Sequence, residues 1–454
     1  MKRRFALIIC VTALSLACII AALPSPQDYA GDELLGRYKY EQFKKPDRCG
    51  QCHVEIYQQW RQGMHGQAYS HHWDEIEYFE LAVPHAGKDP KMADLKADCN
   101  GCHAPLSFMA GDVPPPHVSE KSRANESVSC IVCHSIAGMK GDTPFNFNYI
   151  IRPGNVFHGP RGVGTSPEHE IRQNDFFGKA ELCGTCHNEK NPFGLWVKST
   201  HLEWQEGPWS EEGVECQVCH MPPAPMLNAK MGHRYDDVHQ HMNHGAHDTG
   251  KLSGAIEMRI TPDAREVVLG DPVRLTLVLF NAKCGHKVPS GSAEERQLWV
   301  RVEAVDAEGN VYHLPVDHKG FEGEGQTITS NEPAYFDIGE IKGIAGFQGL
   351  QRDALPEGDR IFCLPYFDPQ GRRTICQWNT AGQGVDYRIG PRETKVETYT
   401  WEIPFEVKPG AVRVHAVISY RRLVKSVADF LNVPPDETEI VLISETQTVF
   451  NVLD

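Results

Sequence analysis

The sequence predicts an α+β chain with more than one domain, in which a loop-rich, mainly α-helical part is followed by an antiparallel β-sandwich. Two observations support this. Cys-x-x-Cys-His occurs five times between residues 49 and 220, in a stretch rich in Gly, Pro and His. Beyond about Leu252, apolar and polar residues alternate with the period of β-strands. The length of 454 residues is consistent with two or three domains.

Each Cys-x-x-Cys-His motif is typical of a site that attaches c-type haem. The two thiols form thioethers with the haem vinyl groups, and the adjacent His becomes an axial iron ligand. A zinc-ribbon array is the alternative, but it would not require His after every second Cys. The motifs use ten of the fifteen cysteines and predict five covalently bound haem c groups, held by Cys49, Cys52, His53, Cys99, Cys102, His103, Cys130, Cys133, His134, Cys183, Cys186, His187, Cys216, Cys219 and His220.

The formal net charge is −15, and two propionates on each haem would make the loaded protein still more acidic. This charge argues against nucleic acid or an anionic membrane surface as a partner. Redox proteins, either other cytochromes or a membrane oxidoreductase, are the expected partners.

Residues 1–23 are expected to be a signal peptide or an N-terminal membrane anchor. Lys2, Arg3 and Arg4 precede an apolar run from Phe5 to Leu23 that is just long enough to span a bilayer. An uncleaved anchor, cleavage, and lipidation at Cys18 remain three alternatives. Because haem attaches to these motifs outside the bacterial cytoplasm, we expect an exported protein, periplasmic or at the cell surface and possibly membrane-anchored.

Residues 24–45 are predicted to form a linker, and residues 46–250 a pentahaem domain whose core consists largely of porphyrin. A short helix is expected after each motif. The clearest covers Glu55 to Met64, where Ile56 and Trp60 share one face.

Residues 251–454 are predicted to form an Ig-like or fibronectin-like β-sandwich. Turn signals separate several alternating segments, and the strands are expected at 274–279, 298–305, 397–405 and 412–420. Cys363 and Cys376 flank a turn centred on Pro369 and Gln370, so a disulfide between them is expected, with two buried thiols as the alternative. Cys284 is expected to be unpaired.

The first motif lies in Asp47–Trp60, followed by Gly63-Met64-His65, and this segment resembles the opening of multihaem cytochromes related to the tetrahaem cytochrome c of ammonia-oxidising bacteria. The same family is also resembled by the residues around the third and fifth motifs, Val128–His134 and Val214–Pro222. The β-rich half resembles a C-terminal domain that often accompanies them, with Asn281 and then Gly285–Gly291. This chain departs from the tetrahaem pattern by its fifth motif and added sandwich.

The resemblance also suggests the second axial ligands. It implies that His65 and His169 each bind the iron of a neighbouring haem, and that His241 and His247 do so from a His-x-x-x-Gly-Ala-His run. His286, in its Gly-His-Lys-Val-Pro-Ser-Gly setting, is expected to bind a haem from the sandwich side, with a turn-capping role as the alternative.

The remaining histidines leave other possibilities open. Reserve ligands, or partners of propionates, are His71, His72, His117, His158, His201, His233, His239 and His244. A divalent metal site among His233, His239, His241, His244 and His247 is a minor alternative. A Lys or Met could also be a sixth ligand.

The state of the sixth iron position separates the possible functions. Filled by His, the iron is suited to electron transfer, whereas an open position permits chemistry on a small molecule. The leading expectation is therefore a non-catalytic electron carrier with bis-His haems, in a respiratory or extracellular electron-transfer chain. A reductase or oxidase of a small nitrogen or sulfur compound, and a subunit of a conducting filament, are the alternatives.

Overall fold

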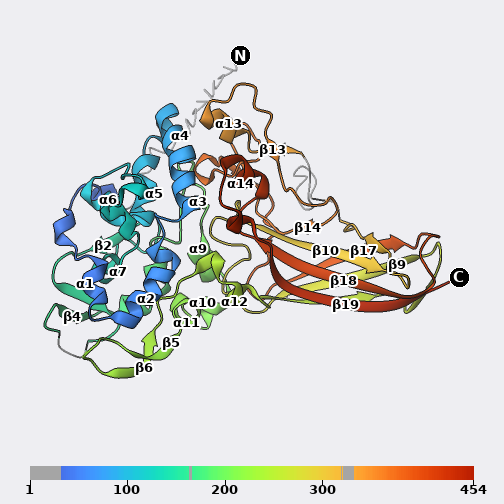
Figure 1. The fold of residues 1–454 in the computed structure, drawn as a ribbon, viewed down its shortest axis with the longest axis horizontal. Coiled ribbons are helices and arrows are strands. Elements are labelled where there is room, and N and C mark those ends of the chain that lie inside the picture. Colours follow the sequence, from blue (N-terminus) through green and yellow to red (C-terminus); the bar gives the residue numbers. More distant parts are fainter. Residues whose placement is uncertain (1–31, 163–165, 319, 321–331) are drawn as a thin grey trace, which may run out of the picture.

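The computed structural model describes residues 32–162, 166–318, 320 and 332–454. It consists of a helical part and a β-rich part that lie side by side along the longest axis (Figure 1). Helices α1–α12 belong to the first part, and the long strands β7, β9, β10, β17, β18 and β19 to the second. The α+β architecture expected from the sequence is therefore present.

The helices of the first part are short, and most contain or flank a motif. Their bounds are α1 Pro46–Gly50, α2 Val54–Gln62, α3 His72–Ile76, α4 Val83–Lys88, α5 Leu95–His103, α6 Pro105–Ala110, α7 Cys130–Ser135, α8 Ala180–Gly184, α9 Thr200–Gln205, α10 Pro208–Glu211, α11 Cys216–His220 and α12 Thr249–Leu252. A helix follows directly only after the first two motifs. The third and fifth motifs lead into strands β1 (Ile136–Met139) and β5 (Pro223–Leu227), so the expectation of a helix after each motif is wrong.

The described part of the expected linker packs against the helical part. Leu34 and Phe43 are buried in one cluster with Phe108 and Met109 of α6. The Tyr38 N–H donates to the Met109 carbonyl at 2.9 Å. Residues 32–45 therefore belong to this part of the fold, because the side chains of Leu34 and Phe43 are buried in a hydrophobic cluster there.

Short strand pairs complete the helical part. β1 pairs antiparallel with β2 (Tyr149–Ile151), β3 (Val156–Gly159) pairs parallel with β4 (Glu170–Gln173), and β5 pairs antiparallel with β6 (Arg234–His239). These pairs carry loops that supply backbone acceptors to the motif histidines, as described below.

The second part is built on two packed sheets. One has the order β11-β10-β18-β19-β8, with β14 also pairing β10, and the other has the order β17-β9-β7. All pairs are antiparallel except β8 with β19. The bounds are β7 Ile256–Pro262, β8 Glu266–Val268, β9 Pro272–Asn281, β10 Gln297–Val305, β11 Val311–His313, β14 Arg360–Ile361, β17 Thr394–Glu402, β18 Gly410–Arg421 and β19 Val441–Leu453.

Alternating residues of these strands form the core between the sheets. Leu275 and Leu277 of β9 face the same buried cluster as Val414 and Ala416 of β18. The segments predicted at 274–279, 298–305 and 412–420 lie in β9, β10 and β18, and β17 covers residues 397–402 of the fourth segment, which was predicted to reach residue 405. The period-two pattern was informative because each sheet buries only one face. An Ig-like classification stays a prediction.

A second hydrophobic cluster joins the two parts. Helix α13 (Phe336–Lys342) and helix α14 (Lys425–Leu431) lie beside α3 and α4 (Figure 1). Trp73 and Leu81 of the helical part share this cluster with Ile338, Trp378 and Val427. The boundary between the parts is thus a packed apolar interface, which holds loops of the β-rich part against the motifs.

The expected disulfide between Cys363 and Cys376 is wrong, since both are buried free thiols. The turn pairs Phe367 with Arg373, and the Thr374 N–H donates to the Tyr366 carbonyl. This register is one residue away from the one that would place the two cysteines opposite each other. A one-residue shift turns side chains to opposite faces.

The expected signal or anchor at residues 1–23 lies outside the described residues. Within the described ranges, no helix has the length and apolar character needed to cross a membrane.

Candidate haem-binding site

Helix geometry explains how the motif residues reach one side of the backbone. In α5, α7 and α11 the two cysteines and the His stand at positions i, i+3 and i+4, which share a helix face. The first motif differs: Cys49 lies in α1, and His53 caps the start of α2. The spacing therefore directs two sulfurs and one imidazole toward the same space.

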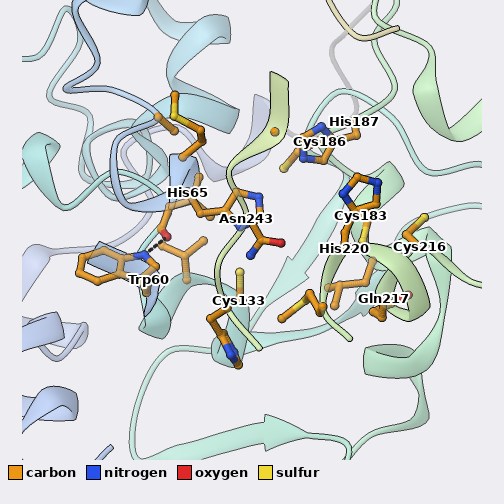
Figure 2. Close-up of a pocket in the computed structure, with 18 of the residues that line it drawn as sticks. Trp60, His65, Cys133, Cys183, Cys186, His187, Cys216, Gln217, His220 and Asn243 are labelled. Atoms are coloured by element: carbon orange, nitrogen blue, oxygen red, sulfur yellow. Dashed lines mark hydrogen bonds between the residues drawn. The ribbon is translucent and has the colours of Figure 1, made fainter. Parts of the chain in front are cut away.

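That space is one large cavity of about 1760 Å³, lined by residues of every motif. Figure 2 shows Cys183, Cys186, His187, Cys216 and His220 gathered around it, with His65 and Trp60 across from them. The Trp60 indole N–H donates to the Val128 carbonyl at 2.9 Å and fixes this wall. A continuous cavity of this kind fits a porphyrin core.

Cysteines of different motifs lie next to each other. The thiols of Cys49 and Cys130 are within hydrogen-bonding range, as are those of Cys183 and Cys216. Cys102 and Cys186 form a third such pair. Attachment points of the first and third, the second and fourth, and the fourth and fifth motifs are therefore adjacent.

Three motif histidines donate Nδ1–H to backbone oxygens. His53 donates to Asn228 at 2.6 Å, His103 to Ala68 at 2.8 Å and His134 to His158 at 2.6 Å. Such a bond fixes the tautomer and leaves Nε2 as the metal-binding atom. These imidazoles are therefore oriented for iron.

Each of three motif imidazoles faces a second imidazole. The ring centroids are 6.3 Å apart for His53 and His169, 6.1 Å for His187 and His65, and 6.3 Å for His220 and His286. Two metal–imidazole bonds of about 2.0–2.1 Å, with each nitrogen about 1.2 Å from its ring centre, span roughly 6.4 Å. The residues at these positions fit an iron held between two histidines.

His241 and His247 have different surroundings. His241 is partly buried, and its Nδ1–H donates to the His239 carbonyl at 2.9 Å. Desolvation, with His134 nearby, lowers its pKa. By contrast, Nε2 of His247 lies 3.0 Å from Oε1 of Glu437. In this structure that nitrogen of His247 therefore faces a buried carboxylate, and the role of His247 as an iron ligand stays a prediction.

Several of these imidazoles are neutral at physiological pH. Burial, with the nearby His187, lowers the pKa of His65 to about 3. Burial, with His134 or His286 nearby, lowers the pKa of His241 and of His220 to about 4. A metal binds the neutral form of imidazole. The cavity therefore presents these side chains in the ligating state.

His103 has a distinct environment. Its Nδ1 also lies 3.2 Å from Oδ1 of Asp74, whose other oxygen lies 3.3 Å from Nδ1 of His71. Burial alone would lower the pKa of His103, but the hydrogen bond to Asp74 raises it to about 9. Among the ring contacts of the described residues, His103 has no histidine partner. The other four motifs each have an opposing or nearby non-motif imidazole.

A buried ionic cluster lies near His103 instead. Lys198 is the cation, and its charge, like that of Glu77, acts on the His103 imidazole. The side-chain amide of Gln377 bridges the charged groups of this cluster. Its oxygen accepts a hydrogen bond from Lys198 at 2.7 Å, and its nitrogen donates to Glu77 at 3.2 Å and to Glu294 at 3.1 Å. Burial and the charge of Glu295 raise the pKa of Glu77 to about 8.

Sequence reasoning missed this cluster, because its members are far apart in the chain. Glu77 begins a π-helical turn, Glu77–Ala82, between α3 and α4, while Glu294 and Gln377 come from the β-rich part. π-Helical turns are frequent at functional sites, but no pattern in the sequence predicted this one.

The reserve histidines have varied roles. His158 and His239 supply backbone acceptors to His134 and His241. His117 stacks on Phe79 at 3.8 Å between centroids. Both ring nitrogens of His201 are buried without a partner in the described residues, which fits a side chain facing a group such as a propionate.

One protein family matches part of the chain. Residues 48–135 match the family described as "Cytochrome c554 and c-prime". Its span contains the first three motifs. A search of curated proteins found no match.

Among solved structures, a penta-heme cytochrome c552 from Thermochromatium tepidum is similar over 91% of this chain and 99% of its own, with 20% identity and a TM-score of 0.58. This shows a shared fold. A CARDB domain from Pyrococcus furiosus (44% of this chain, 87% of its own, 12% identity, TM-score 0.17) and Spo0M from Bacillus subtilis (44%, 49%, 9%, 0.16) were also found. Neither carries any argument about this chain.

Proposed function

We propose that this multihaem c-type cytochrome is an exported pentahaem electron carrier whose haems are held mostly by two histidines each. The observation that carries the proposal is the spacing of three imidazole pairs at 6.1–6.3 Å, each joining a motif His to a distant one. When bound, haem iron alternates between ferric and ferrous states and so carries one electron at a time.

The protein's own residues support this role in two ways. Desolvation lowers the pKa values of His65, His220 and His241, which keeps these imidazoles neutral and able to bind iron. Contacts between Cys49 and Cys130, and between Cys183 and Cys216, bring neighbouring attachment points together. Close packing of that kind favours transfer within the chain over reaction with solvent.

The β-rich part has a place in this proposal beyond that of a spacer. His286 lies in the loop after β9, and its Nδ1–H donates to the Lys287 carbonyl at 2.9 Å. Nε2 is thereby left for the iron attached at His220. We assign His286 as the sixth ligand of that iron, which would join the two parts of the chain through the metal.

Electron paramagnetic resonance of the oxidised holoprotein tests the proposal. Low-spin ferric signals should account for at least four of five irons. High-spin signals from two or more irons would overturn the assignment of a carrier with mostly bis-His haems.

A second candidate function is favoured by the surroundings of His103. The partly buried Lys198 and the carboxyl groups of Glu77 and Glu294 lie near it, and they could hold a small anion and supply protons to it. The candidate is a reductase or oxidase of a small nitrogen or sulfur compound at this one iron. A spectral change on adding nitrite or hydroxylamine, limited to one haem, would support it, and an unchanged spectrum would contradict it.

A further inference from the structure

Three histidines outside the motifs meet at one carboxylate oxygen. Oε1 of Glu437 lies 3.2 Å from Nε2 of His71, 3.1 Å from Nε2 of His72 and 3.0 Å from Nε2 of His247. Glu437 is buried, in the 3₁₀ helix Pro435–Thr438 of the β-rich part. The histidines come from the helical part, at the start of α3 and in the turn before α12.

Hydrogen bonding alone does not account for this arrangement well. One oxygen of an ionised carboxylate has two lone-pair sites, whereas three imidazole nitrogens approach it at hydrogen-bonding distance. The rings are also crowded: the centroids of His71 and His72 are 4.1 Å apart, and those of His71 and His247 are 5.0 Å apart. A cation among the nitrogens would satisfy their lone pairs together with the oxygen.

We propose that His71, His247 and Glu437 bind a divalent first-row transition metal, of which Zn²⁺ is the representative. Their ligating atoms all lie within 4.8 Å of one another. Tetrahedral coordination at about 2.0–2.2 Å from the metal places neighbouring ligand atoms roughly 3.3–3.6 Å apart. The Nε2 atoms of His71 and His247 lie 3.2 and 3.0 Å from Oε1 of Glu437. Two His and one Glu form a set that zinc enzymes use, with a further position for water.

Groups around the three ligands orient them for a metal. Asp74 lies 3.3 Å from Nδ1 of His71, so Nε2 of that ring points toward Glu437. Arg422 lies 3.4 Å from Oε2 of Glu437, which leaves Oε1 for the metal. Ligating histidines and carboxylates are commonly held by such outer hydrogen bonds. Asp436 also lies 3.8 Å from His72 and adds negative charge nearby.

The site lies between the two parts of the chain, at the wall of the large cavity. The side chain of His247 is 27% exposed, whereas Glu437 is buried. Because one ligand comes from the β-rich part and two from the helical part, a bound metal would link them. Through His71 and Asp74 it would also be two hydrogen bonds away from His103.

Zinc binding to the chelator-treated holoprotein is the test. Isothermal titration with Zn²⁺, combined with the zinc-to-iron ratio by elemental analysis, should give one zinc per five irons. Glu437→Gln should weaken binding by at least about tenfold. Glu445→Gln is the matched control, because Glu445 contacts the exposed His415 at 3.0 Å on the sandwich surface, and it should bind zinc like the native protein.

A second variant separates the loss of a metal ligand from a loss of the fold. His247→Gln alters a partly exposed side chain and should also lose zinc, while the haem absorption spectrum verifies that each variant is folded. Zinc should raise the thermal unfolding midpoint of the native protein but not that of either ligand variant. Equal zinc content in the native protein and both ligand variants, or none in any of them, would overturn the proposal. Neither result bears on the five haem sites.

Discussion

Arg388 of the β-rich part donates from Nη1 to Oε1 of Glu203 on α9 at 2.5 Å, and both side chains are buried. The other oxygen of Glu203 accepts from the Ser290 hydroxyl at 2.6 Å, and Arg388 also donates to the Pro289 carbonyl at 3.2 Å. Ser290 and Pro289 belong to the loop that carries His286. This ion pair therefore holds the loop in the position from which His286 faces His220.

Glu203→Gln is expected to destabilise the protein by about 3 kcal/mol, since it leaves a buried guanidinium only partly compensated by Asp386. Glu212→Gln is the matched control. Its partner Arg392 also joins the two parts, at 2.5 Å, but this pair is exposed to solvent and contributes little to stability. Thermal unfolding compares the two, and equal shifts would contradict the assigned role of the buried pair.

His286→Ala is expected to convert one of five haems to a high-spin form, because His220 loses the imidazole 6.3 Å away. Electron paramagnetic resonance and the absorption spectrum measure the change. His415→Ala, on the exposed face of β18, serves as the control and should leave every haem unchanged. If His286→Ala gave the native spectrum, the ligand would have to come from the helical part.

Five covalent haems are expected from the five complete motifs. The intact mass of the purified holoprotein should exceed that of the polypeptide by five haem masses. The double variant Cys216→Ser and Cys219→Ser should lose one haem, since both thioether bonds of the fifth site are removed. A native mass with four haems or fewer would refute the count.

Lys198→Met is expected to weaken cyanide binding at the His103 iron roughly tenfold, equivalent to about 1.4 kcal/mol, because a partly buried cation that favours an anion is removed. Absorption titration of the oxidised protein gives the affinity. Lys179→Met, at an exposed pair with Glu215, should have no effect. Failure of the native protein to bind cyanide at any haem would show that the sixth position near Lys198 is filled.

Cys363 and Cys376 are expected to react with iodoacetamide in the denatured, unreduced protein, since both are thiols. Peptide mass spectrometry identifies the modified residues. The motif cysteines provide an internal control, because thioether bonds protect them. A Cys363–Cys376 cross-linked peptide would contradict the register of this turn.

Two local patterns in the sequence, the spacing of the motif residues and the alternation of apolar and polar residues, predicted features that depend only on local structure. The spacing of Cys99, Cys102 and His103 is a property of one helical turn, so the haem attachment sites could be read directly. The alternation in β9 and β18 likewise predicted strands, because neighbouring side chains of a strand point to opposite faces.

The family resemblance added two expected iron ligands, His65 and His169. The structure brings them close to His187 and His53, respectively. It did not indicate that His247 would meet Glu437, since the partner lies 190 residues away. The turn between Cys363 and Cys376 was ambiguous by a single residue of register, and only the folded hairpin decided it.

Local patterns predicted the haem attachment motifs, the division into a motif-bearing and a β-rich part, and the main strands, because each depends on residues within a few positions of one another. Which imidazoles pair, which carboxylates surround Lys198 and which residues contact Glu437 became visible only in the folded chain. Those choices depend on burial and on contacts between distant segments, where the cost of an unpaired charge selects the partners.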